Sequence, residues 1–198
     1  MGKFIVTIAR EYGSGGRTVA QLVAKKLGVS FYDNKMLERT AEESGLAKEV
    51  IAEAEQKKTN SFLYSLYMNS MELPISDKIF IVQSKIIRQI SEQESAVIVG
   101  RCADYVLSEY SPCIRVFLHA PLEERVKRAV EEYGVSSRNP QFTVIRKDKD
   151  RSSYYNYFTD KKWGKVQNYD IALSTSIGLE ECADIIVKYV KTVIGKEE

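Results

Sequence analysis

Cysteine, histidine and proline are scarce in this sequence, and each scarcity excludes a class of protein. The 198 residues include three cysteines, one histidine and four prolines. Cys102, Cys113 and Cys182 are widely spaced and form no C-x-x-C pair, so neither a cysteine zinc cluster nor a disulfide framework is expected. Reduced buried thiols are the simplest interpretation. The single histidine, His119, has no serine, cysteine or second histidine spaced to use it, which favours a structural over a catalytic role.

The sequence also lacks long apolar runs and a strong charge of either sign. No run approaches the roughly 20 apolar residues of a membrane span, and no apolar signal segment precedes the first predicted strand. The net charge of +2 gives no overall attraction to nucleic acid or to a membrane surface. The length fits one domain with a proper core. We therefore expect a single cytoplasmic domain without nucleic-acid or membrane partners.

Short apolar segments alternate with amphipathic ones along the chain. We predict strands at residues 4–9, 29–32, 96–99, 114–119 and 169–174, and helical segments at 18–27, 35–44, 47–57, 76–92, 102–108, 121–133, 147–157 and 179–194. This alternation predicts an α/β fold with a parallel sheet and right-handed crossovers. Ligands of such sheets gather at the carboxyl ends of the strands. Those ends carry residues 13–18, Asp33, Gly100-Arg101 and His119, and the first three are the polar clusters where chemistry is expected.

The most informative segment is the glycine-rich turn after the first strand. An apolar run from Phe4 leads into Gly13-Ser14-Gly15-Gly16-Arg17-Thr18 and then into a helix. Glycines let backbone N–H groups curl around anionic oxygens, and the helix directs its positive end to the same place. The strict pattern is G-x-x-x-x-G-K-[ST], but laid on residues 11–18 it has Glu11 at the first glycine and Arg17 at the lysine. A register shifted by one residue places Gly16 at the lysine, so neither register contains one. The segment predicts a phosphate-binding loop in which Arg17 supplies the cation; a glycine-rich turn without a ligand is the alternative.

Two residues near this turn have a functional and a structural interpretation. The Thr18 hydroxyl is the natural Mg²⁺ ligand of such a loop, and it can also begin or cap the helix. Asp33 follows Phe31-Tyr32 at a strand end, where it can bind an acceptor hydroxyl, act as a weak base, or cap the next helix.

Cations and aromatic residues are concentrated in two later segments. The run from Ile145 to Arg151 can form a mobile basic flap over bound phosphates or an ordinary solvated helix face. The aromatic residues after it can stack a nucleobase or pack the flap on the body; they are Tyr154, Tyr155, Tyr157 and Trp163. The stretch from Phe62 to Met71 is rich in Met and aromatic residues, which is typical of insertion core, a dimer face or a partner surface.

These residues together resemble the cytidylate-kinase-like family, a bacterial branch of the P-loop nucleoside-monophosphate kinases. The resemblance spans nearly the whole chain, and the segments that carry it are Ile8 to Arg17, Phe31 to Asp33, Val97 to Tyr105, Arg151 to Tyr155, Trp163-Gly164 and Asn168 to Asp170. It implies a three-layer P-loop NTPase fold with a core at residues 1–33, 93–133 and 166–198, an acceptor-binding insertion at 34–92 and a lid at 134–165. The sequence departs from true cytidylate kinases at Cys102, where they carry an acidic residue.

The resemblance also implies an activity and a set of site residues. The activity is transfer of the ATP γ-phosphate to a nucleoside monophosphate such as CMP or dCMP, with Mg²⁺. The ATP site is Gly13, Ser14, Gly15, Gly16, Arg17 and Thr18, with Thr18 on the metal; Arg101 and Asp33 bind the acceptor; Arg17, Arg151 and Lys147 are the catalytic cations. Two alternatives stay open, a kinase of similar fold that acts on a small-molecule hydroxyl and a non-catalytic nucleotide sensor. A homodimer is also open.

Overall fold

The computed structural model describes residues 2–33, 74–136 and 138–195. The helices expected at 35–44 and 47–57 lie outside these residues, as do the stretch from Phe62 to Met71 and most of the expected acceptor-binding insertion. The division into core, insertion and lid therefore stays a prediction.

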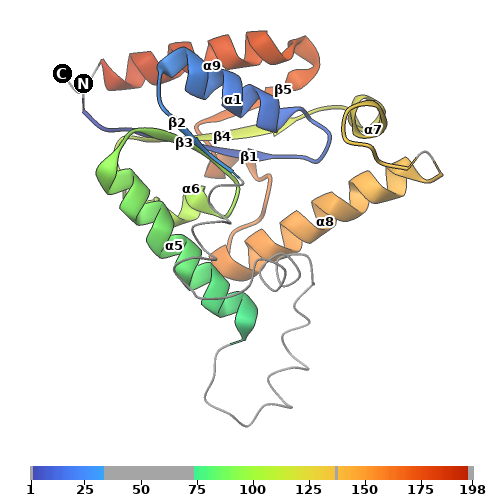
Figure 1. The fold of residues 1–198 in the computed structure, drawn as a ribbon, viewed down its shortest axis with the longest axis horizontal. Helices are drawn as coiled ribbons and strands as arrows, with labels where there is room; N and C mark the ends of the chain where they lie inside the picture. The colour runs from blue at the N-terminus through green and yellow to red at the C-terminus, as the bar shows by residue number, and fades with distance from the viewer. Residues whose placement is uncertain (1, 34–73, 137, 196–198) are drawn as a thin grey trace.

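A five-stranded parallel sheet forms the centre of the molecule (Figure 1). Its strands are β1 (Ile5–Arg10), β2 (Ser30–Tyr32), β3 (Ala96–Val99), β4 (Cys113–His119) and β5 (Ile171–Ser174). Their order is β2-β3-β1-β4-β5, so β1 lies in the middle with β3 and β4 on either side. The carboxyl ends of β1 and β3 are therefore neighbours, although about 90 residues separate them in the chain.

Helices cover both faces of the sheet and produce three layers (Figure 1). On one face lie α1 (Gly16–Leu27) and α9 (Leu179–Ile194), and on the other lie α5 (Ile75–Gln93) and the short α6 (Ala103–Val106). Beyond the carboxyl ends of the strands, α7 (Leu122–Glu131) packs against α8 (Pro140–Thr159). Two 3₁₀ turns, η1 (Val166–Asn168) and η2 (Thr175–Ile177), flank β5. The α/β prediction is thus confirmed.

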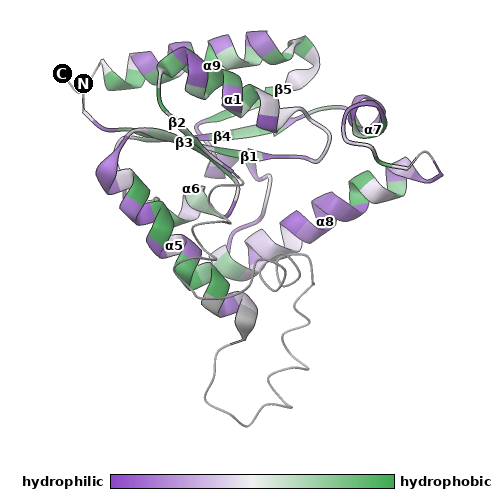
Figure 2. Cartoon of the chain, in the orientation of Figure 1, coloured by the Kyte–Doolittle hydropathy of each residue, from purple (hydrophilic) through white to green (hydrophobic). Residues whose placement is uncertain are grey.

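Alternating side chains of the central strands supply two hydrophobic cores. Val6 and Ile8 of β1 pack with α1 and α9, whereas Ile5 packs with α5 and α6. This is the period of two expected of a strand that is buried on both faces. Figure 2 shows the same division, with the hydrophobic sides of α1 and α9 turned toward the sheet and a largely hydrophilic α8.

The expected strands agree with the structure to within two residues, and the helix boundaries differ in instructive places. The first helix begins at Gly16 instead of residue 18, because its first turn starts inside the glycine turn. The basic helix begins at Pro140 instead of residue 147, because the Asn139 side chain accepts a hydrogen bond from the Phe142 amide at 3.3 Å and Pro140 occupies the first turn. No helix in the described residues has both the length and the apolar composition needed to cross a membrane.

Candidate active site

The turn between β1 and α1 needs its glycines for two separate reasons. Gly13 and Gly15 have φ angles of +80° and +77°, which side-chain-bearing residues rarely adopt. The chain also passes very close to its neighbours: a Cβ on Gly13 would lie 2.3 Å from the Arg125 carbonyl oxygen, and one on Gly16 would lie 2.7 Å from Cβ of Arg10. The turn is therefore a compact backbone loop with no room for side chains at these positions.

The carbonyl oxygens of this turn are bound from the opposite side by α7 and η2. The Arg125 guanidinium donates to the Tyr12 carbonyl at 3.1 Å, that of Arg128 to Gly13 at 2.8 Å, and the Thr175 hydroxyl to Ser14 at 2.7 Å. Within the described part of the chain, no backbone carbonyl accepts from the amides of residues 15–18. These donors of a helix N-terminus have no backbone partner, and such a position suits an anion.

One of these amides faces a side chain. Burial raises the pKa of Tyr133, and the Gly15 amide beside its hydroxyl lowers it in part. The Tyr133 ring also meets the Tyr12 ring edge-on, with 5.7 Å between centroids. A phosphate that binds the Gly15 amide must therefore displace the Tyr133 hydroxyl.

An ionic network centred on Arg125 joins the turn to α7 and α8. Arg125 is almost buried, its Nε lies 3.2 Å from Oε2 of Glu11, and its Nη1 pairs with Asp148 of α8. Asp148 in turn accepts from the Tyr12 amide at 2.6 Å. Three segments far apart in the sequence are thus held together at the start of the glycine turn.

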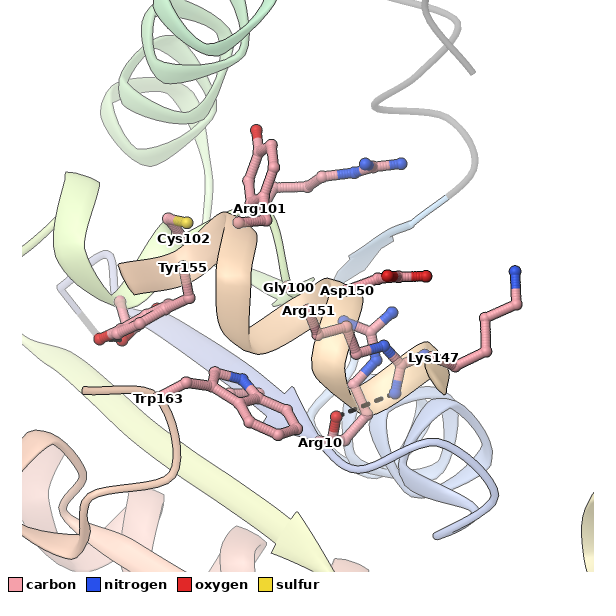
Figure 3. A pocket seen from close by; sticks show the side chains of 12 residues that line it. Arg10, Gly100, Arg101, Cys102, Lys147, Asp150, Arg151, Tyr155 and Trp163 are labelled. Atoms are coloured by element: carbon pink, nitrogen blue, oxygen red, sulfur yellow. Dashed lines mark hydrogen bonds between the residues drawn. The ribbon is translucent and has the colours of Figure 1, made fainter. Parts of the chain in front are cut away.

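A cavity of about 240 Å³ lies at the carboxyl ends of β1 and β3, beside this turn (Figure 3). Four cationic side chains line it, namely Arg10, Arg101, Lys147 and Arg151. In Figure 3, Arg10 and Arg151 lie next to each other, while Cys102 and Tyr155 lie at the opposite end. Only two carboxylates, those of Asp104 and Asp150, line the cavity beside the four cations, so the lining keeps an excess of positive charge.

Burial is the main influence on the pKa values of Arg10 and Arg151. Burial and, to a smaller extent, the charge of Arg151 lower the pKa of Arg10 to about 9, while the charge of Asp33 opposes this shift. Burial also lowers the pKa of Arg151, while Asp148 raises it. The Arg151 guanidinium donates to the Arg10 carbonyl at 3.0 Å and lies 5.3 Å from the centroid of the Tyr12 ring. The fold therefore holds two cations close together, an arrangement that an anionic ligand would stabilise.

The turn after β3 has a strained backbone. Gly100, Arg101 and Cys102 have consecutive φ angles of +76°, +60° and +55°. Non-glycine residues in this region cost of order 1–3 kcal/mol each and cluster at functional sites. Arg101, which was expected to bind the acceptor, is thus held on a strained backbone.

The other end of the cavity is uncharged apart from one buried carboxyl group. The Tyr155 hydroxyl donates to Oδ2 of Asp104 at 2.6 Å. Burial raises the pKa of Asp104, and the hydrogen bond from Tyr155 lowers it in part. Trp163 also lines this cavity and meets the Phe117 ring edge-on. Tyr155 and Trp163 therefore line the cavity and also pack against the body of the protein.

The structure brings some expected site residues into the cavity and places others beside it. Arg101, Lys147 and Arg151 line the cavity. Arg17 and Asp33 do not line it; they form an ion pair with 2.9 Å between Nε and Oδ2, and the Arg17 side chain is 51% exposed. His119 lines a second cavity and its carbonyl accepts from Thr175 at 3.3 Å.

Thr18 is the one expected metal ligand, and its surroundings fit that role. It lies in the first turn of α1, and its hydroxyl makes no hydrogen bond to any described residue. The described residues contain no cluster of three or more His, Cys, Asp or Glu that could hold a metal. Mg²⁺ at nucleotide sites needs no such cluster, because phosphate oxygens and waters complete its shell.

Sequence reasoning missed several residues of this site. Arg10 precedes the glycines and lies in the segment from Ile8 to Arg17, but the pattern for phosphate loops assigns no role to that position. Arg125, Arg128 and Asp148 are charged residues of helices, a setting in which charge usually means solvent exposure. Only the packing of α7 and α8 against the turn shows their role.

Comparisons with known proteins identify the family and the fold. The sequence model described as the cytidylate kinase-like family matches residues 5–177. A cytidylate kinase of Ignicoccus hospitalis is 22% identical over 174 residues, which cover 87% of this chain and 90% of that protein. The crystal structure of an uncharacterized protein from Eubacterium ventriosum is 29% identical, with a TM-score of 0.75 over 96% of this chain and 99% of that one. Shikimate kinase of Bacteroides thetaiotaomicron shares the fold at 14% identity, with a TM-score of 0.56 over 96% and 98%. The chain belongs to the cytidylate kinase-like family.

Proposed function

We propose that this protein transfers the γ-phosphate of ATP to a nucleoside monophosphate of the CMP or dCMP type. The observation that carries the proposal is the cationic cavity at the ends of β1 and β3, which is linked to the glycine turn by Arg10: this residue lines the cavity and packs against Gly16. Phosphoryl transfer requires positioning and neutralisation of charge more than covalent help from the protein. The glycine turn can position the phosphate groups, and the cationic cavity can neutralise their charge.

The donor site is the glycine turn with the start of α1. The amides of residues 15–18 receive the ATP phosphates, and Arg17 adds a cation to them. Thr18 holds Mg²⁺, which neutralises phosphate charge and helps to align the reacting oxygens. The carbonyl partners Arg125, Arg128 and Thr175 keep the turn in the shape that presents these amides.

The acceptor site is the cavity. A nucleoside monophosphate carries a phosphate dianion, which suits a lining that includes Arg101, Lys147 and Arg151. A neutral sugar hydroxyl has no need of so many cations. Asp33 lies at the end of β2, where it can reach an acceptor hydroxyl after it releases Arg17. Residues 134–165 then act as the lid, because α8 carries Lys147 and Arg151.

A coupled assay of ADP formation tests this proposal. The purified protein receives MgATP with CMP, dCMP, UMP, AMP or GMP, and with shikimate and gluconate as hydroxyl acceptors. We expect turnover with CMP or dCMP above the other acceptors. Turnover with the hydroxyl acceptors alone would favour the small-molecule kinase, and calorimetric ATP binding without any turnover would favour the sensor.

Two arginines of α8 provide a matched pair of variants. Arg151 lines the cavity, whereas Arg146 is exposed on the same helix and does not. We expect Arg151→Met to lower kcat/KM for the acceptor by about 100- to 1,000-fold, the cost typical of a lost charge stabiliser. We expect Arg146→Met to leave it within about twofold. Equal effects of the two substitutions on kcat/KM would show that the cavity is not part of the active site.

A further inference from the structure

The Arg10 side chain connects the two turns that border the candidate active site. Its Cβ and Cγ would lie 2.7 and 3.0 Å from a Cβ built on Gly16, and its Nη1 would lie 2.2 Å from a Cβ built on Gly100. Arg10 can take this path only because both positions lack a side chain. The Arg10 side chain therefore runs from the donor-side turn after β1 to the acceptor-side turn after β3, and its guanidinium lies against Gly100. Figure 3 shows Arg10 in the cavity that it lines together with Gly100.

No ion pair of the described residues includes the Arg10 guanidinium, although Asp33 is near enough to raise its pKa in part. No described residue accepts a hydrogen bond from this guanidinium. The charged side chain with the largest influence on its pKa is another cation, Arg151, whose own carboxylate neighbour Asp148 is 3.9 Å away. A partly buried cation costs free energy unless an anion pairs with it, and here the open side is the cavity.

Arg17, which stands at the lysine position in one register of the loop pattern, is placed differently from Arg10. Its side chain is half exposed and its charge is paired with Asp33 at 2.9 Å. It does not line the cavity, whereas Arg10 does. In loops that follow the strict pattern, the lysine reaches the β- and γ-phosphates.

We propose that Arg10 is the catalytic cation at the transferred phosphoryl group and supplies the charge that the missing loop lysine would supply. This inference rests on the proposed function. In the transfer, the bond between the γ-phosphorus and the bridging oxygen of ATP breaks, ADP leaves, and a new bond forms from an acceptor phosphate oxygen to that phosphorus. Arg10 forms no covalent bond and exchanges no proton; it donates hydrogen bonds to the phosphoryl oxygens.

Steady-state kinetics of three variants test the role of Arg10 against that of Arg17. We expect Arg10→Met to lower kcat by at least about 100-fold, Arg10→Lys to recover about tenfold of that loss, and Arg17→Met to lower kcat by less than about tenfold. The lysine variant tests whether positive charge at this position is what matters. A larger loss in Arg17→Met than in Arg10→Met would overturn the inference.

A second experiment measures binding without turnover. Thermal unfolding is followed with and without inorganic pyrophosphate, which presents the phosphate chemistry alone. We expect Arg10→Met to unfold at a higher temperature than the wild type in the absence of ligand, since an unpaired cation is removed, and to lose the stabilisation by pyrophosphate. A variant that unfolds earlier and keeps the full pyrophosphate shift would contradict the proposal.

A substitution at Gly100 displaces the Arg10 side chain without replacing it, and the same substitution at Gly28 is its control. Gly100 and Gly28 have φ angles of +76° and +68°, so alanine strains the backbone similarly at both. Only at Gly100 would the new Cβ meet Arg10, because nothing lies within 4 Å of one at Gly28. We expect Gly100→Ala to lose the pyrophosphate shift and Gly28→Ala to keep it; equal behaviour would argue against this position for Arg10.

The outcomes separate this inference from the proposed function. If no acceptor is phosphorylated but the pyrophosphate shift depends on Arg10, the kinase proposal fails and the assignment of Arg10 to a phosphate stands. If the wild type phosphorylates CMP and Arg10→Met does so at the same rate, the function stands and the inference fails.

Discussion

Arg125 offers the most direct test of how the glycine turn is held in shape. Its guanidinium donates to the carbonyls of Ala120 at 3.0 Å and Tyr12 at 3.1 Å, and it pairs with Glu11 and Asp148. Replacement by Met keeps most of the side-chain volume and removes all of these contacts. We expect the variant to fold, with a less stable protein and a less ordered turn.

The expected loss of stability follows from the contacts. The two hydrogen bonds to carbonyl groups contribute roughly 1 kcal/mol each. Removal of one partner of a buried ion pair costs about 3–5 kcal/mol, because it leaves the other charge unpaired. The carboxylates of Glu11 and Asp148 are 25% and 15% exposed, so water compensates part of this cost. We therefore expect a total loss of about 3 kcal/mol.

Urea denaturation measures this loss. With an m value of about 2 kcal/mol per molar, the midpoint should fall by about 1.5 M. The thermal midpoint should fall by about 6–12 °C, since 1 kcal/mol corresponds to about 2–4 °C in a chain of this size. Lys26→Met is the control, because the ion pairs of Lys26 with Glu180 and Asp184 lie at the surface, and its midpoint should not change. If the urea midpoint of Arg125→Met decreases by less than about 0.3 M, the network does not contribute importantly to stability.

Three further outcomes are expected. Because burial raises the pKa of Asp104, its contribution to stability is greatest below the pKa of the unfolded state and declines as the pH rises toward the folded-state pKa. Asp104→Asn should therefore gain stability relative to the wild type between pH 4 and pH 7 in urea titrations, and a constant difference would contradict this. Tyr133→Phe removes the oxygen that faces the Gly15 amide, so KM for ATP should fall by about 2- to 10-fold, the equivalent of one hydrogen bond; an unchanged or higher KM would contradict it. The three cysteines are reduced thiols whose pKa values burial raises, to about 11 for Cys113, so they should react with a disulfide reagent at pH 7.5 only after urea is added, and fast reaction of the folded protein would count against this.

The sheet was predictable because its signal is local. Each strand is a short apolar run bounded by turn residues, and the helices between them carry apolar residues at helical spacing. The helix predicted at 76–92 has apolar residues at helical spacing; Ile79, Ile86, Ile87 and Ile90 are buried, and Val82 is partly buried against the same core. The helix predicted to end at residue 27 does so, and Gly28 follows it with a φ of +68°.

The charged contacts of the site were not predictable in the same way. The ion pair of Arg125 with Asp148 joins residues 23 positions apart on two helices, and the contact of Arg125 with Tyr12 spans 113 positions. No local pattern encodes such pairs, since they depend on how α7 and α8 pack at the end of the sheet. Arg10 was hidden for a different reason. Its path requires glycine at both position 16 and position 100, and that coincidence is visible only in three dimensions.

The ion pair between Arg17 and Asp33 raises the question of whether these two residues block the roles proposed for them. Both lie near the donor site, and each is bound to the other at 2.9 Å. Arg17 is 51% exposed, so solvent screens the pair and its contribution is at most about 1 kcal/mol. A nucleotide at ten times its dissociation constant supplies about 1.4 kcal/mol, which is enough to open a pair of that strength. The pair therefore sets the resting positions of Arg17 and Asp33 without locking the site. Nucleotide binding can separate the two residues, which leaves Asp33 available for an acceptor hydroxyl while Arg10 keeps its place between the two turns.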